Sequence, residues 1–524
     1  MSRVVQTVKM DKLYSGLAWL SRLGAAVVLV LTGAFLLFLT VSAFVETAFV
    51  STNNAAGELV ELYADNVFLN ALVLVMLMST LYLLYRHSQS FKMLRLELLL
   101  MAVVLLLGVA FILSVKLAAP WYSDSYQLLY AAERAAVGDY AAFDAYFCRF
   151  PFQLGYVLYV ELCFRLMGSL MPGLPAGYYR LALQGLNLLW LMLSYHALIQ
   201  LVWQLFRNRR VQKITAILLL LCLPPVLSCT FLYGNIPGFA LGTISLWMFA
   251  AFSRERRLWQ GLLCALSMGL AVVMKLNMMI FFAALAIVWL LELLRKRSLQ
   301  SLVCLLLTVA SVLGLSGLPQ TVYERRSGLS FGEGIPMVAW LAMGMEQGHA
   351  GPGWYKEDHT VDAFMESGMD SEKTAEKAWQ TVKSRAGYFA DNPGEALKFF
   401  SGKLRSQWNE PTYESLWINQ VQLSYGEKGF LYELFCDEGK QETRWGMNQY
   451  QQLIFLGALL ACVFLWHRRE LLQCLPLLVV LGGILYHLLF EAKSQYALPY
   501  FVLMIPVAAY GFCCLFRNMK DQMN

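Results

Sequence analysis

Asp124 is the acidic residue whose position in the chain points most directly to chemistry. It stands between two serines, a few residues beyond the long apolar run 96–119, with Tyr122 close by. A carboxylate at a membrane face can act as a general base, taking a proton from a hydroxyl as that hydroxyl attacks a substrate. Serine and aspartate also favour the N-cap of a helix, so a purely structural role stays open. We predict Asp124 as the catalytic residue and Tyr122 as part of the substrate site.

Three basic residues are candidates for contact with a phosphate group. Lys275 lies in MKLNMM between two apolar runs, Arg180 opens a long apolar helix, and Lys493 belongs to the turn EAKSQYALPYF. An ammonium or a guanidinium suits a phosphate because each offers several charged hydrogen-bond donors. For Arg180 the alternative is an arginine whose head reaches the membrane surface. For Lys493 the alternative is a surface ion pair that contributes little energy.

Further polar residues lie near aromatic ones in two stretches. Glu491 and Tyr496 share the turn EAKSQYALPYF, and Glu346 and His349 belong to MEQGHAGPGWY. We predict all four as substrate-binding residues. A lone histidine three residues from a glutamate is a weak metal signal, and Asp124 has no second acid beside it, so no metal site is predicted. The sequence holds no P-loop, GxSxG or HExxH motif.

The rest of the chain indicates a membrane setting for these residues. Of its 524 residues, 58% are hydrophobic and 15% are charged, whereas a soluble protein carries roughly a quarter charged residues. Continuous apolar runs of about 20 residues can cross the hydrocarbon core. This pattern indicates an all-α polytopic membrane protein and excludes a β-barrel, whose strands alternate. We predict about twelve spans, at 22–45, 67–85, 97–119, 181–206, 214–232, 236–253, 258–274, 278–294, 300–318, 450–466, 471–489 and 496–516.

The basic residues predict the orientation, and they decide whether the ambiguous stretch 150–168 spans. Short loops rich in Lys and Arg favour the cytoplasmic side. All of them fall on that side if the N-terminus is cytoplasmic and 150–168 does not span. Glu161 and Arg165 lie one helical turn apart on one face, which suits a helix in the membrane interface. We expect a multi-pass protein of a cell membrane, the bacterial plasma membrane, with both termini cytoplasmic. The net charge of +6 belongs to these loops, so no nucleic acid partner is predicted.

This topology leaves two large external segments. The first is the loop 120–180, with interfacial helices, and the second is 319–449, with helical patterns at 371–390 and 394–408. We divide the chain into an N-terminal pair of transmembrane helices (1–95), a membrane core with the external loop (96–318), an extracytoplasmic loop domain (319–449) and C-terminal transmembrane helices (450–524). Cys148 and Cys436 both fall on the external side, so a disulfide between them is left open.

Four stretches together resemble the GT-C superfamily of integral membrane glycosyltransferases, in particular the protein O-mannosyltransferases and aminoarabinose transferases of glycosyltransferase family 39. They are WYSDSYQLLYAAERAAVGDY, YFCRFPFQLGYVLYVELCFRLMG, Arg180 at the start of the next span, and EAKSQYALPYF, while MKLNMM is a weaker fifth. Their order and sidedness agree over about 97–516. The chain departs from the mannosyltransferases in having two spans before the external loop instead of one, and a single Asp124 instead of an acidic pair.

The resemblance implies a polyprenyl-phosphate sugar as donor and a cell-envelope glycan, lipid or protein as acceptor. It implies transfer on the extracytoplasmic face of the lipid bilayer, with Asp124 as general base and inversion at the anomeric carbon. We expect no cofactor besides the lipid-linked sugar, and the residues give no support for a divalent metal. A twelve-span secondary transporter fits the topology equally well, although such proteins usually bury ionisable residues within their spans. A non-catalytic flippase or assembly partner of envelope glycans is a third alternative.

Overall fold

A computed structural model describes residues 2–53, 57–115, 124–143, 145–173, 176–296, 298–422 and 428–523. Nearly all of its secondary structure is helical, as predicted. In this part of the chain nine helices are long and apolar enough to cross a membrane. They are α1 (Ser2–Val45), α2 (Val67–His87), α3 (Met93–Val115), α7 (Ala176–Phe206), α10 (Asn235–Glu255), α12 (Met279–Lys296), α13 (Leu299–Ser316), α21 (Lys440–Leu465) and α23 (Ser494–Met523).

Three further apolar segments complete the membrane part. α8 (Arg209–Leu220) and the short α9 (Pro224–Leu227) form a bent pair, with a 50° angle, that makes up to one more span. The chain breaks there at a Pro-Pro pair, which cannot continue a helix. α11 (Leu258–Met274) and α22 (Leu475–Leu489) are shorter apolar helices. With these, each of the twelve predicted spans coincides with an apolar helix or, once, a bent helix pair.

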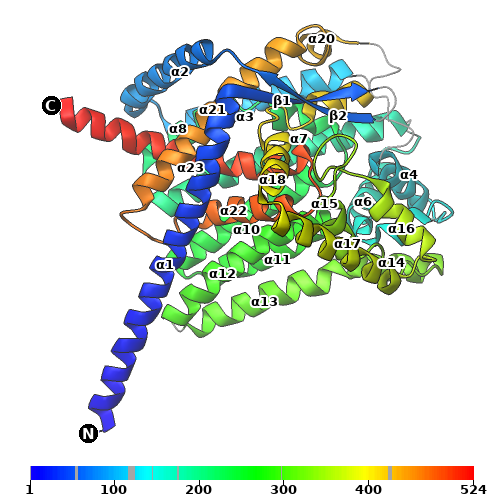
Figure 1. Cartoon of the computed structure of the whole chain (residues 1–524), viewed down its shortest axis with the longest axis horizontal. Coiled ribbons are helices and arrows are strands. Elements are labelled where there is room, and N and C mark those ends of the chain that lie inside the picture. The colour runs from blue at the N-terminus through cyan, green and yellow to red at the C-terminus, as the bar shows by residue number, and fades with distance from the viewer. Residues whose placement is uncertain are drawn as a thin grey trace.

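The helix bundle is built around α10 and α23. In the most apolar part of α10, 83% of the residues are buried, and in that of α23, 78%. The corresponding share in α2 is 11%, so α2 lies at the edge of the bundle. α10 packs against α7 and α11, and α23 packs against α21 and α8. Figure 1 shows α1 along one side of the bundle, with its N-terminal end outside the bundle and the chain entering β1 at the other end.

Two of the loops predicted to share the cytoplasmic side, those after α2 and before α8, lie together. The Arg210 guanidinium donates to the Tyr85 hydroxyl at 3.1 Å, and the Lys213 ammonium donates to the Ser88 carbonyl at 2.7 Å. The basic loop before α8 therefore meets the basic end of α2, as the charge distribution requires if both loops emerge on one side. Which side faces the cytoplasm stays a prediction from the charge bias.

The predicted helix 150–168 corresponds to α6 (Leu154–Leu170), which follows α4 (Asp124–Ala136) and α5 (Ala145–Arg149). α6 is not among the helices that qualify as spans in the described part of the chain, and it packs against α4 and α14 (Leu318–Ser327). Its buried Glu161 accepts from Arg165 at 2.7 Å and from the Tyr323 hydroxyl at 2.6 Å. The predicted ion pair exists, and it also ties α6 to α14.

The external segment 319–449 contains both predicted helices, α17 (Ser371–Asp391) and α18 (Pro393–Trp408). Its other helices are α15 (Met337–Gly344), α16 (Val361–Glu366), α19 (Ser415–Gln422) and α20 (Phe430–Cys436). Trp408 and Tyr413 are fully buried and belong to the same core as the membrane helices. No disulfide joins Cys148 to Cys436, because the Cys436 thiol is buried beside α3 while Cys148 packs with the core of α4 and α6.

One short β-hairpin interrupts the otherwise α-helical chain. Between α1 and α2 the strands β1 (Glu46–Asn53) and β2 (Gly57–Ala64) form an antiparallel hairpin, with Glu46 paired with Ala64 and Asn53 with Gly57. β1 is rich in Thr, Val and Phe, which favour strands. Each strand has only 8 residues and lies between two long apolar runs. The alternation of polar and apolar residues that marks a strand is therefore hard to recognise in the sequence.

Candidate functional site

Asp124 is the first residue of α4, and its side chain is exposed. The Tyr233 hydroxyl donates to its Oδ2 at 2.9 Å. The neighbouring Ser125 hydroxyl donates to the Leu232 carbonyl at 2.9 Å and is buried. Two adjacent residues of α4 thus bind two adjacent residues of the turn before α10, which holds the carboxylate in one place although it faces outward.

Tyr233 links Asp124 to the short helix that precedes α6. The Gln153 side-chain amide donates to the Tyr233 hydroxyl oxygen at 2.5 Å, while the hydroxyl proton points to Asp124. Burial raises the pKa of Tyr233 well above its usual value, and the charge of Asp124 raises it further. Tyr233 therefore stays protonated and acts as a fixed donor to Asp124. Burial also raises the pKa of the nearby Tyr146, and the charge of Asp124 and a hydrogen bond to it add to that shift.

Lys275 contacts the ring of Tyr233, whereas Asp124 contacts its hydroxyl. Lys275 is the residue that directly follows α11, and only 8% of it is exposed. Its Nζ lies 3.7 Å from the centroid of the Tyr233 ring and 5.5 Å from that of the Tyr496 ring. Within the described ranges the ammonium has no hydrogen-bond or ion-pair partner. Burial lowers its pKa to about 7, although the charges of Asp124 and Glu491 oppose that shift. The two rings offset part of the cost of burying this cation, but no anion in the described residues pairs with it, so an anionic ligand would be stabilised here.

Glycine at position 234 allows this close approach. Gly234 has a φ of 70°, and a Cβ there would lie 2.3 Å from the Met274 carbonyl oxygen. The turn that carries Tyr233 consequently touches the end of α11, one residue before Lys275. Gly155 in α6 works in the same way, because a Cβ on it would lie 2.1 Å from the Val273 carbonyl oxygen. Two glycines bring α6, α11 and the turn before α10 to one point.

Glu491 contributes a second carboxylate to this region. It lies in the turn between α22 and α23. Its pKa is raised to about 7, mainly by burial. The negative charge of Asp124 adds to this shift, and the positive charges of Lys493 and Lys275 oppose it. These groups therefore lie close enough to influence one another's charge. Tyr355 belongs here too, because burial raises its pKa and the charges of Glu491 and Asp124 add to that shift.

Lys493 is already engaged by carboxylates. Its Nζ lies 2.5 Å from Glu58 of β2 and 3.9 Å from Glu414. Burial alone would lower its pKa, but the charges of Glu58, Glu414 and Glu491 outweigh burial and raise it. Lys493 is thus a permanent cation whose charge is used within the protein. The phosphate contact predicted for it is untested, and its ion pair leaves Lys275 as the better candidate.

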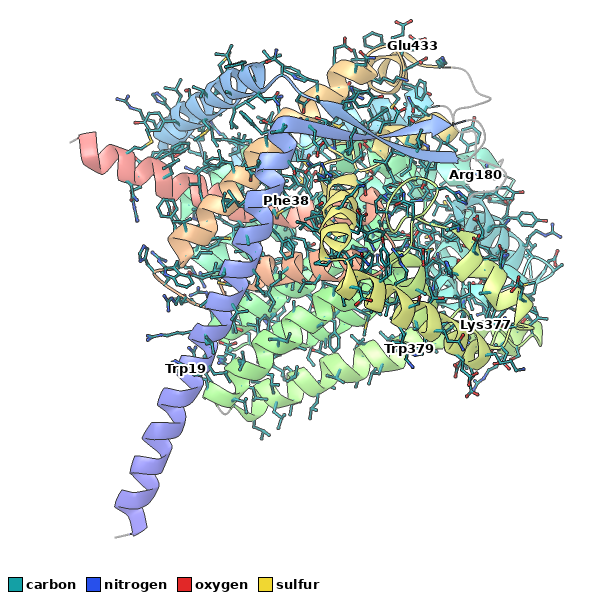
Figure 2. The ribbon with its side chains drawn as sticks, in the orientation of Figure 1. Trp19, Phe38, Arg180, Lys377, Trp379 and Glu433 are labelled. Atoms are coloured by element: carbon teal, nitrogen blue, oxygen red, sulfur yellow. The ribbon has the colours of Figure 1, made fainter. Side chains whose placement is uncertain are left out.

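The remaining predicted residues make other contacts. Glu346 pairs with Arg385 at 3.4 Å, and the exposed His349 faces Glu357 at 4.0 Å, so both belong to surface ion pairs of the large loop. Arg180 lies in the first turns of α7, on the side of the view that also holds α4 and α6 (Figure 2), and no interaction joins it to Asp124 or Lys275. Tyr122 lies outside the described residues.

Several residues of the cluster were missed in the sequence. Tyr233, Gln153, Glu58 and Glu414 carry no motif of their own, and only Tyr233 had a usable signal, since it directly precedes the turn GNIPG. The stretch WNEPTYES, residues 408–415, is buried throughout, and Tyr413 and Glu414 adopt positive φ angles of 49° and 60°. Strained backbone of this kind is common at functional sites.

We call the group of Asp124, Tyr233, Lys275, Glu491 and Tyr496 the acid–lysine site. It combines an exposed, oriented carboxylate with a buried ammonium, so it can accept a proton from one group while balancing negative charge on another. The described residues contain no group of three or more His, Cys, Asp or Glu side chains that could hold a metal ion.

No family model and no curated protein matches the chain. Among solved structures it is similar to the archaeal oligosaccharyltransferase AglB from Archaeoglobus fulgidus, in complex with an inhibitory peptide and a dolichol-phosphate. The TM-score is 0.40 and the identity 11%, over 80% of this chain and 52% of AglB. It is also similar to ArnT from Cupriavidus metallidurans in the apo state, with a TM-score of 0.35 and 14% identity over 79% of this chain and 77% of ArnT. The match thus spans about half the length of the archaeal protein.

Proposed function

We propose that this protein is an inverting membrane glycosyltransferase. It moves a sugar from a polyprenyl phosphate to a hydroxyl of a cell-envelope acceptor on the extracytoplasmic face. The observation that carries the proposal is the acid–lysine site, where the exposed Asp124 and the buried Lys275, whose ammonium contacts only aromatic rings in the described residues, both contact Tyr233. Glycosyl transfer from a lipid phosphate needs one base and one cation in this arrangement.

In the proposed reaction Asp124 takes the proton of the acceptor hydroxyl as its oxygen attacks the anomeric carbon. The new carbon–oxygen bond forms on one face of the sugar, and the bond from the anomeric carbon to the phosphate oxygen breaks on the other. The electron pair of that bond leaves with the phosphate, whose negative charge Lys275 balances. Attack opposite to the leaving group inverts the anomeric configuration.

The surroundings of the two residues suit these roles. Tyr233 holds the carboxylate of Asp124 in one orientation, and the residue is exposed, so an acceptor hydroxyl can reach it. The Lys275 ammonium lies where α11 ends, at the level of the turns that join the membrane helices. A phosphate bound there would have its prenyl chain beside the apolar helices. Glu491, held partly protonated near neutral pH by its burial, would not repel that phosphate strongly.

The test uses the purified full chain in proteoliposomes with a panel of synthetic polyprenyl-phosphate sugars. Release of polyprenyl phosphate is measured with and without envelope extract as acceptor. Asp124→Asn is expected to lower the rate by roughly a hundredfold to ten-thousandfold, the usual contribution of a general base. Asp139→Asn is the matched control, since Asp139 is an acid of the same loop that pairs only with Arg134 and binds its own turn.

Full activity of Asp124→Asn would exclude its role as the base. Failure of the wild-type protein to release polyprenyl phosphate from any donor, together with solute flux into the proteoliposomes, would favour the transporter. Unchanged chemistry but altered complex formation in Asp124→Asn would favour an assembly partner.

A further inference from the structure

The β1–β2 hairpin is fastened to the parts of the chain that surround the acid–lysine site. The Ala48 amide donates to the Asn409 carbonyl at 3.1 Å, and the Val60 amide donates to the Ala350 carbonyl at 3.2 Å. Both outer edges of the hairpin are thus bound by the large loop. Its inner face buries Val50, 1% exposed, in a small core with Trp354 and Ala492.

Ala492 belongs to the turn between α22 and α23 that carries Glu491 and Lys493. The same turn is bound by the large loop, because the Ala492 amide donates to the Gly353 carbonyl at 2.7 Å. The Lys403 ammonium donates to the Phe490 carbonyl at 2.5 Å, one residue before Glu491. The backbone of the turn is therefore bound by Gly353 and Lys403 of the large loop. The hairpin contacts the same turn, because Val50 packs in one core with Ala492.

Glu58 supplies the side-chain contact from the hairpin. Its carboxylate lies 2.5 Å from the Lys493 ammonium, and the two side chains are only 15% and 17% exposed. The second acid, Glu414, is farther from Lys493 at 3.9 Å and is already bound by the Gln495 amide at 3.2 Å and the Ser494 hydroxyl at 3.0 Å. Glu58 is therefore the principal partner of Lys493, and it comes from an element 435 residues earlier in the chain.

We propose that Glu58 is a positioning residue that holds Lys493, and through it the turn carrying Glu491, in place beside Asp124 and Lys275. On this proposal the hairpin between the first two spans is part of the active region and not a spacer. Removing one partner of a buried ion pair leaves an uncompensated charge that must find a new arrangement. The nearest acids available to a released Lys493 are Glu414 and Glu491, so the turn would shift within the site itself. The consequence for catalysis rests on the proposed function.

The first experiment is a double-mutant cycle on sugar transfer by the full chain. Glu58→Gln is expected to lower kcat by roughly tenfold to a hundredfold, because small displacements of a catalytic group have effects of that size, with little change in donor KM. Lys493→Met is expected to cause a similar loss. The double variant should be no slower than Lys493→Met alone, since contacts that act as one unit are not additive. Losses that multiply in the double variant would overturn the proposal.

Matched controls separate positioning from general damage. Glu61→Gln should be neutral, because Glu61 lies on the opposite face of β2 and binds only the Tyr63 hydroxyl of its own strand. Glu58→Asp keeps the charge and should restore most of the activity. If Glu58→Gln does not fold, the double variant carries the test, because removing both members of the pair leaves neither charge buried without its partner.

A second measurement does not depend on transfer. The rate at which an amine-reactive reagent labels Lys493 is measured by mass spectrometry in the same protein. Labelling should be several-fold faster in Glu58→Gln than in the wild type and unchanged in Glu61→Gln, because the lost partner stabilises the ammonium. Equal labelling in all three would overturn the proposal. Inactive wild-type protein with faster labelling in Glu58→Gln would refute the proposed function while leaving the contact of Glu58 with Lys493 intact.

Discussion

Lys275 offers the sharpest test of how the site recognises its donor. Lys275→Met keeps the length of the side chain and removes its charge. A hydrogen bond to a charged group contributes about 1.5–3 kcal/mol, so the variant should bind a lipid-linked sugar phosphate roughly 10- to 150-fold more weakly at about pH 6. Its thermal stability should change little, because the cost of burying an ammonium without an anion is lost together with its contacts to the Tyr233 and Tyr496 rings.

The pH dependence of binding carries a second signature of Lys275. Its pKa is lowered to about 7, so the ammonium is charged below that pH and loses its proton as the pH rises through it. A ligand that needs the charge should bind with constant affinity below about pH 7 and lose about tenfold per pH unit above it. Glu491 acts in the same direction, since its pKa is raised to about 7 and its negative charge appears over the same interval.

The assay is equilibrium binding of a non-hydrolysable polyprenyl phosphonate sugar to the protein in nanodiscs, from about pH 6 to about pH 9. The phosphonate ester keeps one negative charge throughout, so the pH dependence reports the protein. Lys275→Met should show only the shallower decline caused by Glu491, and Glu491→Gln only the decline caused by Lys275. Lys296→Met, at the far end of α12 where Lys296 pairs with Glu292, is the control. Wild-type affinity with an unaltered pH profile in Lys275→Met would refute the phosphate role.

Two further changes test how the site is positioned. Tyr233→Phe removes the hydroxyl that binds Asp124 but keeps the ring beside Lys275. The kcat should therefore fall roughly tenfold, the contribution of one hydrogen bond to a charged group, while donor affinity stays unchanged. Tyr178→Phe, at an exposed tyrosine, is the control, and a weaker donor affinity in Tyr233→Phe would contradict the assignment. Gly234→Ala forces a Cβ against the Met274 carbonyl and should lower stability by about 1–3 kcal/mol and weaken donor binding. Gly185→Ala meets open space and should not destabilise, as thermal unfolding would show.

Most of the membrane architecture could be predicted from the sequence, because the bilayer imposes its own rules. Backbone groups in lipid must bond within their own helix, so each spanning helix needs one uninterrupted apolar run. The predicted ranges 22–45 and 236–253 therefore coincide with α1 and α10. The amphipathic pattern before Trp408 likewise predicted α17 and α18 nearly to the residue. Local periodicity carries this information because a helix repeats its exposure every 3.6 residues.

The candidate site could be predicted only in part. Asp124, Lys275, Glu491 and Tyr496 were recognisable as polar residues beside apolar runs, and the structure brings all four together. Arg180, Glu346 and His349 have the same local character, yet Glu346 and His349 form ion pairs with Arg385 and Glu357 of the large loop. Nothing in the neighbourhood of a residue along the chain distinguishes these two groups, because proximity depends on how helices distant in sequence pack.

What the sequence by itself determined is the helical membrane fold and the order of its apolar helices, since both follow from local hydropathy. Only the tertiary structure decided which polar turns meet. Tyr233 reaches Asp124 across 109 residues, and Glu58 reaches Lys493 across 435. Such pairings depend on close contacts such as that of Gly234 with Met274. The energy of a contact of this kind belongs to the packed pair and not to either residue alone.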